Sequence, residues 1–167
     1  MKIICITGTP GTGKTTLALK LSKALTFPVL DVKEFIKQKK LAESYDQKRK
    51  CAVVDEKLLS KELLKEITKV KKEHYPEGII IDSHLSHYLP SSKVDLCIVA
   101  KASLKVISNR LKKRKYSKLK IKDNLEAEAF DTCYEEAKAL KHNLLVTDTT
   151  KGIKITSLLP KIRGAMR

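Results

Sequence analysis

The sequence predicts an α/β fold in which helices cover both faces of a parallel β-sheet. Short apolar runs rich in β-branched residues alternate along the chain with longer segments whose apolar residues recur at helical spacing. The first run, residues 3–6, leads into a glycine-rich segment at residues 8–15 that matches G-x-x-x-x-G-K-[ST], and a helical pattern follows. Together these features indicate a three-layer P-loop NTPase fold.

The elements follow one another without an internal repeat or a low-complexity linker. The expected strands cover residues 3–6, 27–31, 79–82, 96–100 and 144–146. The expected helices begin near residues 14, 32, 55, 103, 123 and 152, with Asp55 and Asp123 as N-caps. Residues 42–54 lack a clear periodicity and are expected to form a loop. Right-handed crossovers bring the carboxyl ends of all the strands to one edge of the sheet, where ligands bind.

The segment at residues 8–15 has the composition of a polyphosphate site. Gly8, Gly11 and Gly13 allow backbone conformations in which successive N–H groups turn toward one anion, and the following helix adds the positive end of its dipole. Lys14 supplies a mobile cation for the β- and γ-phosphates. The Thr15 hydroxyl is a hard oxygen ligand suited to Mg²⁺, and Thr16 can contact the α-phosphate. We therefore predict an ATP site with Mg²⁺ as cofactor.

A carboxylate and a histidine follow the third predicted strand. Asp82 ends the apolar run at residues 79–81, and a carboxylate in this position of a P-loop protein usually holds Mg²⁺, with a turn-forming aspartate as the alternative. His84 can position a water molecule or the γ-phosphate, but its spacing is equally compatible with an ordinary surface histidine.

Two arginines mark the end of the helix expected from residue 103. Arg110 and Arg114 are four positions apart, so they share a helix face, and guanidinium groups suit the charge that develops during phosphoryl transfer. A solvated basic face is the alternative interpretation.

Composition limits the remaining possibilities. The 167 residues suit one domain, and no apolar run approaches the roughly 20 residues of a membrane span, so we expect a cytoplasmic protein without a membrane partner. The four cysteines form no C-x-x-C pair and are expected to be free thiols. The net charge of +16 is uneven, because residues 96–122 hold ten Lys or Arg and no acid. This indicates RNA as a possible partner, or a lysine-rich surface typical of proteins from hot environments.

Several segments together resemble the adenylate kinase isoenzyme six family, the atypical nucleoside monophosphate kinases that include the coilin-interacting nuclear ATPase and its archaeal homologues. The resemblance covers nearly the whole chain in order. The segments are GTPGTGKTT at 8–16, DSH at 82–84, RLKKRKY at 110–116, NLEAEAF at 124–130 and EEA at 135–137.

The resemblance implies one adenylate kinase-like P-loop domain over residues 1–167, with a monophosphate-binding insert at about 31–54 and a small lid at about 113–123. It implies phosphoryl transfer from ATP to AMP, giving two ADP, with ATPase activity. It further implies a role in maturing small-subunit ribosomal RNA, with ribosomal protein uS11 as partner. The residues that it assigns to ATP are Gly11, Gly13, Lys14, Thr15, Thr16 and the lid arginine Arg114, and those of its metal and water motif are Asp82 and His84.

The chain departs from the family pattern around the acceptor. Residues 45–51 are basic where the family insert is commonly acidic, Lys115 replaces the lid glycine, and Lys33 stands where ordinary adenylate kinases hold the AMP phosphate with arginine. The surplus of basic charge favours an alternative function, an ATP-gated ribosome assembly factor whose AMP phosphorylation is incidental. A kinase for another small acceptor is a third possibility, because the acceptor pocket cannot be assigned from the sequence.

Overall fold

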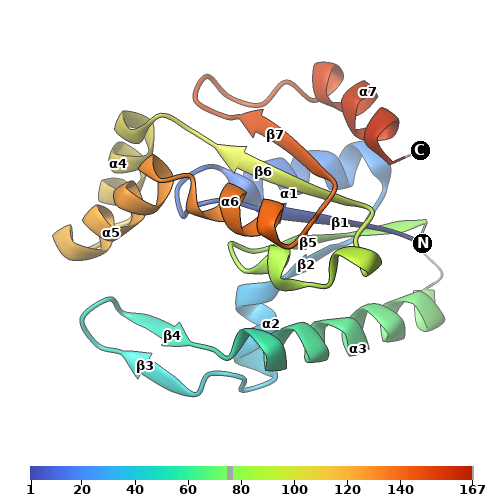
Figure 1. Ribbon diagram of the computed structural model, residues 1–167, viewed down its shortest axis with the longest axis horizontal. Helices are drawn as coiled ribbons and strands as arrows, with labels where there is room; N and C mark the ends of the chain where they lie inside the picture. The colour runs from blue at the N-terminus through green and yellow to red at the C-terminus, as the bar shows by residue number, and fades with distance from the viewer. Residues whose placement is uncertain (75–76, 167) are drawn as a thin grey trace.

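The computed structural model describes residues 1–74 and 77–166, and its centre is a five-stranded sheet in the order β2-β5-β1-β6-β7 (Figure 1). Every neighbouring pair of these strands is parallel, which confirms the predicted fold class. The strands are β1 (Lys2–Thr7), β2 (Val29–Asp31), β5 (Gly78–Asp82), β6 (Leu96–Lys101) and β7 (Leu144–Asp148).

Helices cover both faces of the sheet (Figure 1). On one face, α1 and α7 pack against residues such as Ile4 and Ile6, and on the other face α2, α3 and α6 pack around Cys5. A smaller cluster joins α4 to α5. The helices are α1 (Lys14–Leu25), α2 (Val32–Gln38), α3 (Glu56–His74), α4 (Leu104–Lys113), α5 (Lys118–Ala129), α6 (Thr132–Ala139) and α7 (Ile155–Ala165).

The central strands are buried on both faces, as their uninterrupted apolar runs predict. All five residues of β5 are buried, and Ile79, Ile80 and Ile81 are each at most 1% exposed. Burying one such side chain stabilises the fold by about 1.5–3 kcal/mol. The core therefore fixes the strand ends on which the site depends.

Side-chain caps begin α2 and α3. The Asp31 carboxylate accepts hydrogen bonds from the backbone N–H groups of Lys33 and Glu34, at 2.9 and 3.2 Å, and starts α2. Asp55 accepts from the Leu58 N–H at 2.6 Å and starts α3, as predicted. These caps satisfy N–H groups that have no partner within the helix.

The prediction of a loop at residues 42–54 was wrong. This segment contains an antiparallel hairpin of β3 (Ser44–Asp46) and β4 (Cys51–Val53), which projects away from the main sheet (Figure 1). Each strand has only three residues and most of them are exposed. The sequence therefore shows no alternation of apolar and polar side chains from which the strands could be predicted.

The prediction of Asp123 as an N-cap was also wrong. The cap is Ser117, whose hydroxyl accepts from the Lys120 N–H at 3.2 Å, and Asp123 lies inside α5. The first turn of α5 has no acidic residue, which removed the usual signal of a helix start. The predicted helix is in fact two, because Asp131 adopts φ 53° between α5 and α6 and leaves Phe130 77% exposed.

The described cysteines are free, and Cys5 and Cys97 are buried as predicted. Within residues 1–74 and 77–166, every helix is too short or too polar to cross a membrane.

Candidate active site

The site forms at the carboxyl edge of the sheet, where β1 and β5 end side by side. The glycine-rich loop follows β1 directly, and Asp82, the last residue of β5, is in register with Ile6 of β1. The parallel order of the strands thus places the loop and the carboxylate at the same edge, as the sequence predicts.

The loop takes a conformation that requires glycine at two positions. Gly8 has φ 133°, and a Cβ there would lie 2.2 Å from the carbonyl oxygen of Ala100. Gly13 has φ 88° and precedes the first turn of α1. Gly11 lies between them in the same left-handed region, at φ 95°. The loop therefore delivers backbone N–H groups and the positive end of α1 to one place.

Lys14 is buried at the base of this loop, with 9% of its surface exposed. Its Nζ donates to the carbonyl oxygens of Gly8 at 2.6 Å and Thr9 at 3.0 Å. Burial lowers the pKa of Lys14 to about 8, and the Arg114 guanidinium contributes in the same direction, while Asp82 opposes the shift. Lys14 remains mostly charged at pH 7, so the loop holds a cation ready for an anionic ligand.

Thr15 and Asp82 bring two hard oxygen donors together. Asp82 is 6% exposed, and burial raises the pKa of its carboxyl group, against a side-chain hydrogen bond with Thr15 and the charge of Lys14. A carboxylate that is desolvated and only partly compensated suits a divalent cation. Mg²⁺ in such sites commonly takes one or two protein oxygens and completes its shell with phosphate and water. The pair therefore fits Mg²⁺, and Thr16 is exposed beside it on the first turn of α1.

His84 follows Asp82 by two residues in the turn after β5. Its side chain is exposed, and its carbonyl oxygen lies 3.3 Å from Thr7 Oγ1 at the end of β1. Desolvation by the surrounding protein and then the charge of Lys14 lower the pKa of His84 to about 4. The side chain is exposed, so water offsets part of this desolvation. Any lowering of the pKa from its ordinary value of 6.5 still leaves the ring mostly neutral at pH 7.

The two arginines of α4 have different surroundings. Arg110 donates from Nη1 to the Gly11 carbonyl oxygen at 2.9 Å and from Nη2 to the Thr149 carbonyl oxygen at 3.2 Å, so it braces the loop. Arg114 is the exposed C-cap residue of α4, and its charge acts on Lys14. Arg114 is therefore the one that remains available for an incoming phosphate.

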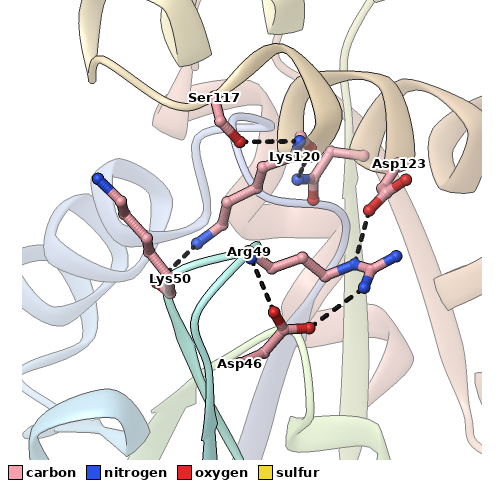
Figure 2. A network of polar contacts seen from close by, with 7 residues as sticks. Asp46, Arg49, Lys50, Ser117, Lys120 and Asp123 are labelled. Atoms are coloured by element: carbon pink, nitrogen blue, oxygen red, sulfur yellow. Dashed lines mark hydrogen bonds and ion pairs between the residues drawn. The ribbon is translucent and has the colours of Figure 1, made fainter.

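Polar contacts connect the β3–β4 hairpin to α5 (Figure 2). Arg49 bridges two carboxylates, with Nη1 3.1 Å from Asp46 Oδ2 in the hairpin and Nε 2.7 Å from Asp123 Oδ2 in α5. Beside it, Lys120 Nζ donates to the Lys50 carbonyl oxygen at 3.2 Å. Segments about 70 residues apart in the chain are thus joined through solvent-accessible charges.

We expect the Arg49→Ala substitution to loosen the hairpin in a salt-dependent way. At low ionic strength, the amides of residues 44–53 should exchange with deuterium faster than in the wild type. At about 1 M salt the difference should vanish, because exposed ion pairs are screened. Lys48→Ala, a charge change on the same hairpin turn, is the matched control. Equal effects of the two substitutions would refute a specific role of Arg49.

Comparisons with known proteins agree with this geometry. A family model described as an AAA domain matches residues 4–131. The chain is 39% identical to a "Putative adenylate kinase" of Pyrococcus furiosus over 89% of this chain and 75% of that protein. It is 34% identical to an "Adenylate kinase isoenzyme 6 homolog" of Dictyostelium discoideum over 81% of this chain and 73% of that protein.

The chain belongs to the adenylate kinase isoenzyme 6 family. It is an adenylate kinase-like nucleotide kinase. A solved deoxyadenosine kinase from M. mycoides with bound dATP shares the fold, with a TM-score of 0.51 at 17% identity and coverage of 98% of each chain.

Some residues around the site of this family member carry no sequence signal. Thr149 follows β7, is 1% exposed, and donates from its hydroxyl to the Thr12 carbonyl oxygen of the loop. His87 is 1% exposed and contacts Thr7, which immediately precedes the loop. Neither residue belongs to a motif in the sequence, and only the fold brings the two next to the P-loop.

Proposed function

We propose that this protein transfers the γ-phosphoryl group of ATP to AMP, giving two ADP, in a Mg²⁺-dependent reaction. The observation that carries the proposal is the meeting of Lys14, Thr15 and Asp82 at the head of α1, with the charge of Arg114 close enough to act on Lys14. The names of the relatives from Pyrococcus furiosus and Dictyostelium discoideum support adenine nucleotides as substrates.

The reaction requires positioning and charge stabilisation rather than a side-chain nucleophile. In the proposal, Gly11, Gly13 and Thr16 bind the polyphosphate of ATP, and Lys14 follows the β- and γ-phosphates. Thr15 and Asp82 would hold Mg²⁺, which neutralises phosphate charge when bound.

Two segments are the moving parts in this proposal. Residues 31–54 form the acceptor-binding insert, and residues 113–123 form the lid. Closure of the lid brings Arg114 onto the transferred group and excludes water. The contact of Arg49 with Asp123 already joins the hairpin of this insert to the lid helix, which supports their closing as a pair.

The same site would act as an ATPase when water replaces AMP. His84 has a neutral imidazole beside the P-loop, so it can orient a water molecule by hydrogen bonding. We expect His84→Ala to reduce AMP-independent hydrolysis about tenfold while the Kd for Mg·ATP changes less than about twofold. His84→Gln, which retains a polar group, should lose less. Parallel losses of ATP affinity and hydrolysis would argue against this role.

A second candidate function is an ATP-gated assembly factor for the small ribosomal subunit, with rRNA and protein uS11 as partners. The surplus of basic charge favours it, because residues 96–122 contain no acid and most of their lysines are exposed. A partner rich in phosphate would release counterions on binding such a surface, and its affinity would fall steeply with salt.

One experiment separates the two candidates. ADP formation from Mg·ATP is measured with and without AMP, and again with small-subunit rRNA or uS11. Strong stimulation by AMP supports the kinase. Turnover that ignores AMP but changes with rRNA or uS11 supports the assembly factor. No ADP formation under any of these conditions would overturn both.

A further inference from the structure

A buried network of hydrogen bonds lies next to the P-loop and is centred on His87. This residue lies in the 3₁₀ helix η1 (Ser86–Tyr88) and is 1% exposed. Its Nδ1 lies 2.6 Å from Thr7 Oγ1, and its Nε2 lies 3.0 Å from Glu136 Oε2 on α6. Thr7 is the last residue of β1 and directly precedes Gly8. The network therefore ends where the phosphate-binding loop begins.

The protonation of His87 gives these contacts a direction. Burial lowers the pKa of His87, and His142, whose Nε2 lies 2.7 Å from the His87 carbonyl oxygen, adds to the shift, while Glu136 opposes it. The neutral ring has one N–H. A carboxylate oxygen only accepts, so Nε2 carries the hydrogen and donates to Glu136. Nδ1 is then the acceptor, and the Thr7 hydroxyl donates to it.

The other groups that face this network are on neighbouring elements. Tyr88 stacks beside His87 with ring centroids 4.5 Å apart, and its hydroxyl has side-chain hydrogen bonds with Glu136 and with Glu56 at the start of α3. Cys133 on α6 has a side-chain hydrogen bond with Thr7. His87 is thus held directly by β1 and α6, and its neighbour Tyr88 is bonded to α3.

The Thr7 hydroxyl has a second acceptor within reach, the His84 carbonyl oxygen at 3.3 Å. A hydroxyl has one hydrogen to donate, and the shorter contact with His87 takes the larger share of it. If His87 did not accept, the hydrogen would turn to the His84 carbonyl oxygen, because the sulfur of Cys133, which is also bonded to Thr7, is a weak acceptor. The identity of residue 87 therefore decides how strongly the Thr7 hydroxyl bonds to the carbonyl oxygen of His84.

Other bonds tie the two ends of this turn to β1, and within the turn the Leu85 N–H donates to Ser83 Oγ at 3.0 Å. Thr7 contacts the turn at the carbonyl oxygen of His84. The Ser83 N–H donates to the Ile6 carbonyl oxygen at 3.2 Å. The Ser86 hydroxyl shares its hydrogen between the same oxygen, at 3.0 Å, and the Ser83 carbonyl oxygen, at 2.9 Å. Between these anchors, the backbone at His84 is the part that a change at Thr7 would move.

We propose that His87 is a positioning residue for the nucleotide site. It accepts the hydrogen bond of the Thr7 hydroxyl and so sets the position of His84. The inference rests on the proposed function, in which His84 orients the attacking water. Such a role is sensitive to position, because a displacement of about 1 Å in an active site can cost about a hundredfold in rate.

Two variants of residue 87 separate its ring nitrogens. Asparagine carries its amide near the place of Nδ1, and glutamine carries it near the place of Nε2, so Asn keeps the contact with Thr7 and Gln keeps the contact with Glu136. We expect His87→Gln to lower the kcat of AMP-independent ATP hydrolysis about tenfold, with the Kd for Mg·ATP within about twofold of the wild type. His87→Asn should retain wild-type hydrolysis within about threefold.

A suppressor tests the path through Thr7. Thr7→Val removes the hydroxyl, so His84 can no longer be pulled by it. The double variant Thr7→Val/His87→Gln should therefore recover most of the hydrolysis that His87→Gln loses. Backbone amide NMR shifts of residues 83–86 should move in His87→Gln and return toward the wild type in the double variant. Equal effects of Asn and Gln, or no recovery in the double variant, would overturn the proposal.

Failure of the role of His87 can be distinguished from failure of the proposed function. If the wild type forms no ADP from Mg·ATP with or without AMP, the proposed function fails, and the amide shifts still decide whether His87 positions the turn. If His87→Gln does not fold, the comparison of Thr7→Val with His87→Asn decides, because both should keep hydrolysis near that of the wild type. A tenfold loss in either would contradict the proposal.

Discussion

Lys14→Ala is expected to reduce ADP formation from Mg·ATP by at least about a hundredfold, with or without AMP. The reason is that Lys14 is the buried cation inside the loop, where Gly8 and Thr9 hold its ammonium group 2.6 and 3.0 Å from their carbonyl oxygens. Burial makes its charge act at low effective dielectric, so removing it leaves the developing phosphate charge without its nearest cation. Steady-state turnover and calorimetry with ATP provide the measurement.

The control for Lys14→Ala is Lys23→Ala, which removes an exposed lysine from the last turn of the same helix. It should leave turnover and the melting temperature unchanged within error. Turnover by Lys14→Ala at the wild-type rate would mean that the phosphates bind elsewhere, and it would refute the site as a whole.

Arg114→Ala is expected to lower kcat by about a thousandfold, with a much smaller effect on the Kd for ATP. Arg110 cannot replace it, because its guanidinium group is bonded to the carbonyl oxygens of Gly11 and Thr149. Arg114 is exposed at the end of α4, so its loss leaves the fold intact and removes a cation that acts mainly in the closed state. Single-turnover kinetics separate the chemical step from binding.

Lys113→Ala is the matched control for Arg114→Ala, since it removes an exposed cation from the adjacent position of α4. It should change kcat less than about threefold. If Lys113→Ala and Arg114→Ala reduced kcat equally, the effect would come from the general positive field of this surface, and a specific contact of Arg114 with phosphate would be excluded.

The part of the site that lies in one strand–loop–helix unit could be predicted from the sequence. The spacing of Gly8, Gly13 and Lys14 fixes a local conformation, and Asp82 follows an apolar run long enough to be a buried strand. Because parallel strands end at one edge, the meeting of the loop with Asp82 follows from local patterns and connectivity. The fold class follows from the same alternation of strands and helices, and the structure confirms it.

Contacts between segments far apart in the chain could not be predicted. Spacing places Arg110 and Arg114 on one helix face, but it cannot tell that Thr149 after β7 captures the first and leaves the second exposed. In the same way, Asp123 has the composition of a helix cap, whereas in the fold it accepts a hydrogen bond from Arg49 of the hairpin.

The sequence by itself determined the phosphate-binding loop, the parallel sheet and the carboxylate beside the loop, because local backbone conformation and hydrophobic periodicity are encoded by neighbouring residues. Only the tertiary structure decided which arginine bonds to the loop and which stays exposed, how the hairpin meets α5, and that His87 contacts Thr7 next to the P-loop. These depend on hydrogen bonds between residues tens of positions apart, such as Thr7 and His87, and no short-range pattern specifies their partners.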